Sequence, residues 1–159
     1  VWIRSRQNMV GYWKMPDATA DALDNDNWFR SGDAGYLDDD GYLYIHDRVK
    51  DMVITGGENV YPAEVESTLL EHPAVADAGV IGVPDDRWGA TVKAVVVRAP
   101  GADLDGDELI VWAKERLAGY KCPSSVDFVD ELPRNPTGKI LKKDLREPYW
   151  RGRERRVSP

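Results

Sequence analysis

The stretch DMVITGGENVYPAEVE, residues 51–66, contains the patterns of a strand, a turn and a helix in immediate succession. Its apolar, β-branched start favours a short strand at 52–55. The glycine-rich run GGEN then predicts a turn. Pro62 suits the first turn of a helix, where its missing amide hydrogen costs nothing, and Val65 and Leu69 lie on one face of that helix. We therefore expect a strand-turn-helix unit here.

Strand and helix patterns alternate along the chain that follows. Valine-rich runs favour strands, and Asp105 can cap a helix at the amide of Glu108, with Gly119 as its stop. The predicted elements are strands at 76–83, 91–98 and 126–129, a helix at 105–119 that buries Ile110, Ala113 and Leu117, and a last short helix around Ile140, Leu141 and Leu145. This alternation predicts an α/β (α+β) domain over residues 48–150, with a short hairpin and a small mixed sheet flanked by helices.

Residues 1–47 have a different character. Short aromatic runs separated by Asp, Asn and Gly predict β structure, and Asp40-Gly41 predicts a turn into a strand at 42–46. We expect no helix of convincing length there. A domain boundary is expected near residues 47–50, and residues 151–159 are expected to form a flexible tail.

Composition excludes several classes of protein. The 159 residues carry a net charge of −7, divided into −13 over residues 1–132 and +6 over residues 133–159. Nucleic-acid binding needs a broad basic face, so the acidic body argues against it, while the basic end suits one local anion. Cys122 is the single cysteine, which excludes an internal disulfide and fits a reducing compartment such as the cytoplasm. No run of eighteen apolar residues predicts a transmembrane segment.

The segment PRNPTGKILKKDLR, residues 133–146, places Lys139 in a frame of prolines and glycine that favours a shaped loop. It is not a phosphate-binding glycine loop, because Pro133 stands where that motif needs Gly and Ile140 follows the lysine instead of Ser or Thr. By spacing alone, Lys139 is either a solvated surface lysine or an anion ligand.

Two further features have a structural and a functional interpretation. Gly56 and Gly57 can simply form a turn, or can let a ligand approach the backbone. Asp33, in SGDAG, can be a turn residue, or its carboxylate can accept both hydroxyls of a ribose. Neither the acidic clusters nor the isolated histidines His46 and His72 have the spacing of metal ligands, so we expect no metal site.

Three segments together resemble one family. They are SGDAGYLDDDGYLYIHDRVKDMVITGGENVYPAEVE, GVPDDRWGATVKAVVV and LAGYKCPSSVDFVDELPRNPTGKILKKDLR. In this order they are similar to the C-terminal part of the adenylate-forming superfamily, which includes acyl-CoA synthetases, adenylation domains and luciferase. The resemblance runs from about residue 10 to 148 and is closest to the fatty-acid and aryl acyl-CoA ligases.

The resemblance implies roles in adenylate formation for four residues. Asp33 corresponds to an aspartate that binds the ribose hydroxyls of ATP, and Arg48, in DRVKD, to an arginine that assists it. Lys50 stands at the hinge between the two domains of such enzymes. Lys139 matches the adenylation lysine, a catalytic residue.

The same resemblance implies a second set of residues that binds coenzyme A. Gly56 and Gly57 match a loop that lines the pantetheine tunnel, Trp88 an aromatic residue near the CoA surface, and Tyr120 a residue that stacks on the CoA adenine. The chain departs from the pattern after Tyr120. Some relatives carry a basic residue in this region, and this chain has Cys122 and Ser124 there.

As a whole, the resemblance implies an ATP-dependent, AMP-forming acyl-CoA synthetase acting on a fatty or other hydrophobic carboxylate. ATP and CoA are then substrates, with Mg²⁺ accompanying ATP and held mainly by a large N-terminal adenylating domain. Residues 1–47 would be the end of that domain, and residues 48–150 its mobile C-terminal partner. The chain alone is then expected to be inactive, because the nucleotide loop and acyl pocket would lie in that large domain.

Two alternatives remain open at this point. An adenylation domain could load a carrier protein, whose pantetheine arm replaces CoA. A stand-alone binding or regulatory module would have no catalysis at all. The expected location is cytoplasmic, or peripheral to a membrane through a lipid substrate.

Overall fold

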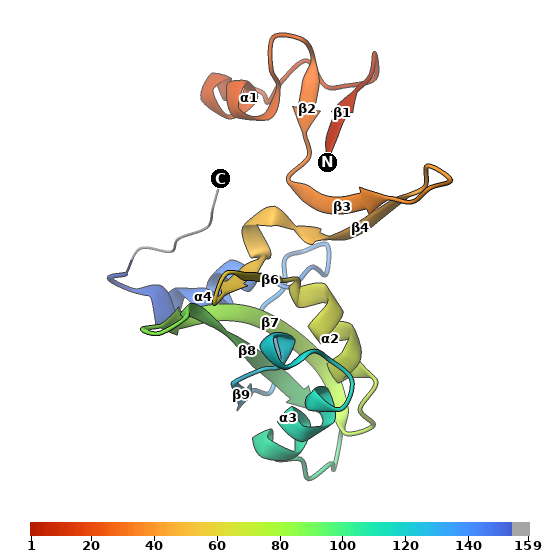
Figure 1. Ribbon diagram of the computed structural model, residues 1–159. Coiled ribbons are helices and arrows are strands. Elements are labelled where there is room, and N and C mark those ends of the chain that lie inside the picture. The colour runs from red at the N-terminus through yellow and green to blue at the C-terminus, as the bar shows by residue number, and fades with distance from the viewer. Residues whose placement is uncertain (154–159) are drawn as a thin grey trace. The chain divides into compact units, whose positions relative to one another are not determined.

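The computed structural model describes residues 1–153 of the chain (Figure 1). Contacts divide the chain into two compact units, Val1–Lys50 and Asp51–Pro159. The division falls beside the stretch 47–50 in which the sequence predicts a boundary. Of the expected tail at 151–159, residues 154–159 lie outside the described part.

The first unit consists of two small antiparallel sheets and one short helix. Each sheet has two strands, and in each sheet a strand pairs with the next strand along the chain. The elements are β1 (Trp2–Arg4) paired with β2 (Trp28–Arg30), β3 (Asp33–Leu37) paired with β4 (Leu43–Arg48), α1 (Pro16–Ala22), and a 3-10 turn, η1 (Val49–Asp51), at the border with the second unit.

The β3–β4 hairpin closes as the Asp-Gly pattern predicts. The Asp38 carboxylate accepts hydrogen bonds from the amides of Asp40, at 3.1 Å, and Tyr42, at 2.8 Å, which fixes the turn. No residue of the first unit is buried. Large apolar side chains on and beside both strands are exposed, namely Tyr36, Leu37, Tyr42, Leu43, Tyr44 and Ile45. The first unit therefore has no hydrophobic core of its own.

The second unit is built on a three-stranded sheet in the order β7-β8-β9. β7 (Val75–Asp85) and β8 (Gly89–Arg98) form a long antiparallel hairpin, and β9 (Ser125–Phe128) pairs parallel to β8. A helix connects β8 to β9, as a parallel pair requires. The mixed sheet that the sequence predicts is thus confirmed.

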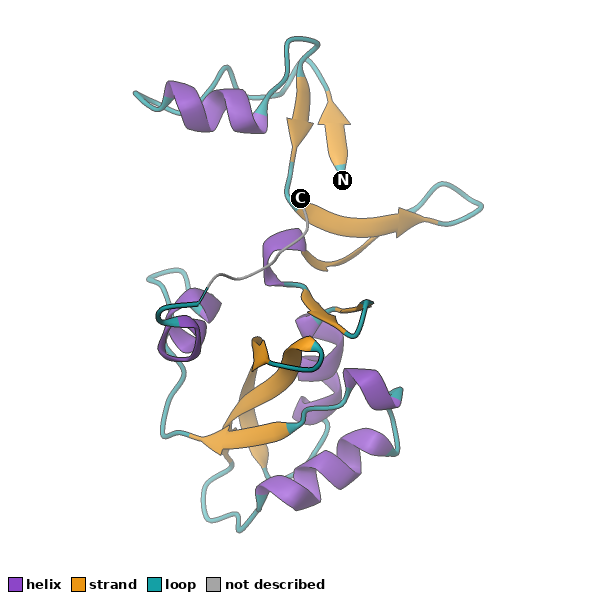
Figure 2. Cartoon of the chain, turned by 60° about the vertical axis from the view of Figure 1, so that its left-hand side comes forward, coloured by secondary structure: helices purple, strands orange, loops and turns teal. Residues whose placement is uncertain are grey.

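Helices cover both faces of this sheet. α2 (Pro62–Leu70) and α3 (Gly106–Lys114) lie on one side and α4 (Lys142–Trp150) on the other (Figure 2). Successive side chains along each strand point to opposite faces of the sheet, so the apolar side chains form two clusters, one on each face. One contains Val80, Val92, Ala94 and Val96 with Val65, Leu69, Leu109 and Ala113, and the other contains Ile81, Val83 and Val95 with Leu132, Ile140, Leu145 and Tyr149.

A short hairpin carries the two glycines. β5 (Val53–Thr55) pairs with β6 (Glu58–Val60), so the turn between them is Gly56-Gly57 alone. Their φ angles of +58° and +89° are those of a two-residue turn with both central residues left-handed, a conformation that favours glycine. Val53 and Val60 are buried and attach the hairpin to the core of the second unit.

The structure corrects several details of the sequence prediction. The first unit contains a helix, α1, where none was expected. The four-residue turn GGEN is a two-residue turn, because Glu58 already belongs to β6. The predicted helix 105–119 ends at Lys114, and a separate 3-10 turn, η2 (Gly119–Lys121), follows. Leu109 is buried on that helix, whereas Ile110 is only partly buried.

Candidate functional site

Lys139 lies in a closed loop between β9 and α4. An antiparallel bridge joins Arg134 to Ile140 across the loop, and the amide of Asn135 donates to the carbonyl oxygen of Lys139 at 2.9 Å. The Gly138 φ of +86° allows the tight reversal just before the lysine. The ends of the loop are thus held together, and Lys139 stands at a fixed position in it.

The side chain of Asn135 organises the interior of this loop. Its Oδ1 accepts hydrogen bonds from the Thr137 amide at 3.1 Å, the Thr137 hydroxyl at 2.8 Å and the Lys139 amide at 2.9 Å. Three donors on one oxygen fix the backbone on both sides of Gly138. The Lys139 side chain itself is exposed, and within residues 1–153 its ammonium has no hydrogen bond or ion pair. Its charge is therefore available to a ligand.

Two ion pairs attach this part of the chain to the rest of the second unit. Arg134 pairs with Asp77, near the start of β7, and its guanidinium also donates to the carbonyl oxygen of Gly138. On α4, Arg146 pairs with Asp51 at 2.7 Å, and both of these side chains are at most 15% exposed. Asp51 is the first residue of the second unit, so α4 is attached where that unit begins.

Asp33 and Arg48 are brought together by the register of the β3–β4 hairpin. The two residues are direct partners across the strands, and Arg48 Nε lies 2.9 Å from Asp33 Oδ1. Arg48 also donates to the carbonyl oxygen of Ser31 at 3.3 Å. The pair is partly exposed, so the carboxylate can accept a ligand hydroxyl while the arginine holds it in place. Lys50, two residues further on, is the last residue of the first unit.

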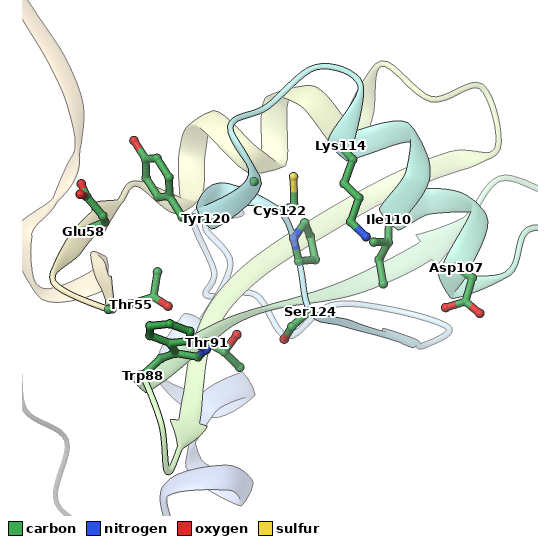
Figure 3. A pocket seen from close by; sticks show the side chains of 13 residues that line it. Thr55, Glu58, Trp88, Thr91, Asp107, Ile110, Lys114, Tyr120, Cys122 and Ser124 are labelled. Atoms are coloured by element: carbon green, nitrogen blue, oxygen red, sulfur yellow. The ribbon is translucent and has the colours of Figure 1, made fainter.

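A cavity of about 630 Å³ lies in the second unit, between the β5–β6 turn, the β7–β8 turn and one side of α3 (Figure 3). Gly56, Trp88 and Tyr120 all line it, and these are residues from three distant segments for which the family resemblance implies contacts with CoA. Gly57 does not, and a Cβ at Gly57 would meet no atom within 4 Å. The volume is in the range of small-molecule sites.

Gly56 and Trp88 are in direct contact at one end of this cavity. The Gly56 amide donates to the Trp88 carbonyl oxygen at 3.2 Å, and a Cβ added to Gly56 would lie 3.0 Å from Cε3 of the indole. Asp85 fixes the turn by accepting hydrogen bonds from the amides of Arg87 and Trp88. The Arg87 guanidinium lies 4.4 Å from the centroid of the indole ring. This glycine is therefore required both by the turn and by the tryptophan beside it.

Tyr120 is held at the same end of the cavity by its neighbour. Lys121 forms an ion pair with Glu64 of α2, with Nζ–Oε distances of 2.7 and 2.8 Å. The hydrogen bonds to Glu64 raise the pKa of Lys121 above its ordinary value, although burial opposes this. Tyr120 itself is 45% exposed, so its ring has a free face for stacking.

The sequence did not identify most of the other residues that line the cavity. Lys114 is the only basic residue among its described lining residues, and it comes from the last turn of α3. The remaining lining residues are Thr55, Glu58, Thr91, Asp107, Ile110, Gly119, Cys122, Pro123 and Ser124. They come from five separate segments, and no local pattern predicts that such segments meet.

The thiol of Cys122 lies in this wall but is not suited to nucleophilic chemistry. Burial raises the pKa of Cys122, and the positive charge of Lys114 only partly opposes this. The cysteine is buried, with its Sγ 3.5 Å from the Ala118 carbonyl oxygen. A protonated, buried thiol is a poor nucleophile, so its role here is to fill space.

Lys139 and the cavity belong to different regions of the second unit. Lys139 does not line the cavity, and its loop is attached through Arg134 to Asp77, near the start of β7. Trp88 follows the other end of the same strand. Asp77 and Asp85 are separated by about 26 Å at the rise of an extended strand. Among residues 1–153, no group of three or more His, Cys, Asp or Glu could hold a metal ion, and no helix is long and apolar enough to cross a membrane.

Comparison with known proteins gives consistent matches. Residues 64–139 match the family model of the AMP-binding enzyme C-terminal domain. A feruloyl-CoA synthase from Amycolatopsis is 56% identical over 141 residues, covering 89% of this chain and 28% of that protein. The fatty acid–[acyl-carrier-protein] ligase ScoC from Streptomyces coeruleorubidus is 48% identical over 158 residues, covering 99% of this chain and 30% of that protein.

A solved structure agrees with these sequence matches. The o-succinylbenzoate CoA synthetase MenE from Bacillus subtilis, in complex with an acyl-adenylate intermediate, superposes with a TM-score of 0.84 at 44% identity. The superposition covers 91% of this chain and 29% of that one. The chain thus spans less than a third of the length of these relatives. Residues 64–139 form an AMP-binding enzyme C-terminal domain, and the relatives of the chain are acyl-CoA ligases and other adenylate-forming enzymes.

Proposed function

We propose that this chain is the C-terminal part of an ATP-dependent, AMP-forming acyl-CoA synthetase. Its second unit would serve as the mobile domain, and its first unit as the end of the large adenylating domain. The observation that carries the proposal is the convergence of Gly56, Trp88 and Tyr120 on one cavity, because the family resemblance implies contacts with CoA for all three residues, which come from separate segments of the chain. The exposed apolar hairpin of the first unit, which has no core, suits an edge that a larger domain covers.

In the first half-reaction, a carboxylate would attack the α-phosphate of ATP, which forms the acyl-adenylate and releases pyrophosphate. Two anions repel each other, and an ammonium between them offsets that repulsion and stabilises the charge that develops on the transferring phosphoryl group. Lys139 fits this task, because its charge is unpaired within the described residues and its loop is held by Asn135. Asp33, fixed by Arg48, would accept the ribose hydroxyls. Mg²⁺ would accompany ATP and be held mainly by the adenylating domain.

In the second half-reaction, the thiol of CoA would lose its proton and attack the carbonyl carbon of the acyl-adenylate, which forms the thioester and releases AMP. The cavity would hold the nucleotide end of CoA, with the β5–β6 turn guiding its pantetheine arm. Rotation about Lys50 would exchange Lys139 for this turn at the reaction centre, since the two lie in different regions of one unit. The ion pair between Asp51 and Arg146 would make that unit rigid from its first residue onward.

The acid substrate is proposed as a hydrophobic carboxylate, because the named relatives act on feruloyl, fatty acyl and succinylbenzoyl groups. A cytoplasmic location suits the single free cysteine.

One relative supports a second candidate function. ScoC is a ligase for an acyl-carrier protein, and it matches over 99% of this chain. Transfer of the acyl group to a carrier protein and not to free CoA would favour this alternative.

The test is Lys139→Ala in the full-length enzyme. Adenylate formation, measured as ATP–pyrophosphate exchange, should fall about 100-fold or more, the usual effect of removing one group that stabilises the transition state. Formation of acyl-CoA from supplied acyl-adenylate should be retained. Equal losses in the two half-reactions would contradict the proposed role of Lys139. Lys143→Met, the same charge removed from an exposed position on α4, serves as the control.

A further inference from the structure

The two ends of the cavity differ in chemistry. Trp88 and Tyr120, with Thr55 and Glu58, lie at one end, and Lys114, Ile110 and Asp107 lie toward the other, with Thr91 and Ser124 between them (Figure 3). Aromatic faces beside a turn suit a flat base or a ring. An ammonium beyond them suits an anionic group of the same ligand. The cavity therefore fits a base that carries a phosphate on its sugar.

Lys114 is the cation that this arrangement leaves free. Lys121, the nearest lysine in sequence to Tyr120, is held by both carboxylate oxygens of Glu64. Arg87 lies over the Trp88 ring and is not among the residues that line the cavity. Lys114 lines the cavity, is exposed, and within residues 1–153 has neither a hydrogen bond nor an ion pair. It stands in the last turn of α3, where a positive charge interacts favourably with the helix dipole.

Two carboxylates also line the cavity and limit its ligand. Glu58 lies at the aromatic end on β6, and Asp107 lies in the first turn of α3, about two turns before Lys114. A ligand with charge along its whole length would be repelled by them. A ligand that places one phosphate near Lys114 and keeps its other charged groups, such as a diphosphate, outside the cavity would not.

We infer that Lys114 binds the 3′-phosphate on the adenosine of coenzyme A and so selects CoA over acceptors without that phosphate. This rests on the proposed function, in which the cavity receives CoA. It also accounts for the departure of this chain from its relatives after Tyr120. Cys122 and Ser124 offer no positive charge, and Lys114 offers one from the facing helix of the same cavity.

The test is a comparison of CoA with dephospho-CoA, which lacks only the 3′-phosphate, on the 159-residue chain. Binding is followed by NMR through the indole signal of Trp88 and the amide of Gly56. The wild-type chain should bind CoA about fivefold more tightly than dephospho-CoA, the effect of one exposed charge-assisted contact. Lys114→Met should abolish this difference without weakening dephospho-CoA, and Lys114→Arg should retain it. The control Lys143→Met should leave it unchanged.

The outcomes separate this inference from the proposed function. If Lys114→Met still distinguishes CoA from dephospho-CoA, or if the wild type binds both equally while the Trp88 signal shifts, the role of Lys114 is refuted and the CoA site stands. If neither ligand shifts the signals of Trp88 and Gly56, the cavity is not a nucleotide site. In that case the inference and the CoA-binding part of the proposed function both fail.

Discussion

At the scale of single residues, the candidate site depends on a few side chains that fix the backbone. Asn135 holds the Lys139 loop through one oxygen, and Asp85 holds the turn that carries Trp88. Neither residue contacts a ligand in the proposed reaction. Both are short polar residues that bond to nearby backbone amides, which is why they occur in tight loops. Their contribution is to determine where an exposed functional side chain stands.

Asn135→Ala tests this positioning role. The variant removes the acceptor for three donors, so the Lys139 loop should become mobile while the lysine remains. We expect ATP–pyrophosphate exchange in the full-length enzyme to fall about tenfold, less than for Lys139→Ala, with thioester formation retained. Asn135→Asp keeps an acceptor oxygen at the same place and should recover most of the rate. If Asn135→Asp is as slow as Asn135→Ala, the positioning role is wrong.

Which of the site residues could be predicted depends on how far apart in sequence they are. Asp33 and Arg48 lie on one hairpin, so the turn at Asp40-Gly41 largely determines their pairing. The frame of proline and glycine left the role of Lys139 open, and the family resemblance implied it. Lys114 was not predicted, because nothing in its own helix shows that it lines the same cavity as Trp88. The two residues come to line one cavity only when the whole unit folds.

At the scale of elements, alternation and capping predicted most strands and helices of the second unit. Asp105 accepts a hydrogen bond from the Glu108 amide at 2.8 Å, as its N-cap pattern predicts. The errors have local causes. α1 has seven residues and no buried side chain, so it shows no apolar periodicity to detect. β6 was missed because GGEN can be a four-residue turn as well as a two-residue turn followed by a strand.

α4 is fixed to the sheet by a polar cluster as well as by apolar contacts. Lys93 of β8 lies 2.6 Å from Asp127 Oδ1, and the Tyr149 hydroxyl donates to the other oxygen of that carboxylate. Partial burial would raise the pKa of Asp127, but the hydrogen bonds from Lys93 and Tyr149 and the charge of Lys93 lower it overall. Burial and the hydrogen bond to Asp127 raise the pKa of Tyr149 to about 12.

This cluster predicts a specific dependence of stability on pH. An unfolded tyrosine has a pKa of about 10, so folding favours the neutral phenol of Tyr149. Its stabilising effect is complete below pH 10 and is lost as the pH rises from about 10 to about 12. Tyr149→Phe should lower the free energy of unfolding by about 1 kcal/mol at pH 7 to 9, and this difference should shrink above pH 10. Urea unfolding of both chains at several pH values measures it. A difference that stays constant to pH 12 would contradict the assignment.

At the scale of the whole molecule, the chain contains one unit with a core and one without. The second unit has two apolar clusters, one on each face of its sheet, while no residue of the first unit is buried. The composition of the chain does not reveal this difference, whereas the burial of its side chains in the structure does. It is consistent with a first unit that is completed by other residues, and with a second unit that can move as one body.

We propose that two separate regions of the second unit serve two successive half-reactions. Gly56 offers the sharpest variant on the CoA side, because a Cβ there would press on the Trp88 ring at 3.0 Å. Gly57 is the matched control. It has a similar left-handed backbone, with φ of +89° against +58°, but its Cβ would meet nothing within 4 Å. Gly57→Ala therefore introduces backbone strain into the same turn without adding a contact with the Trp88 ring.

The most direct measurement is the rate of acyl-CoA formation from supplied acyl-adenylate, compared with ATP–pyrophosphate exchange, in full-length enzyme carrying Gly56→Ala or Lys139→Ala. We predict opposite patterns. Gly56→Ala should slow thioester formation about tenfold, more than Gly57→Ala does, and spare the exchange reaction, whereas Lys139→Ala should do the reverse. If both variants lower both rates to the same extent, the two regions do not serve separate steps, and the account is contradicted.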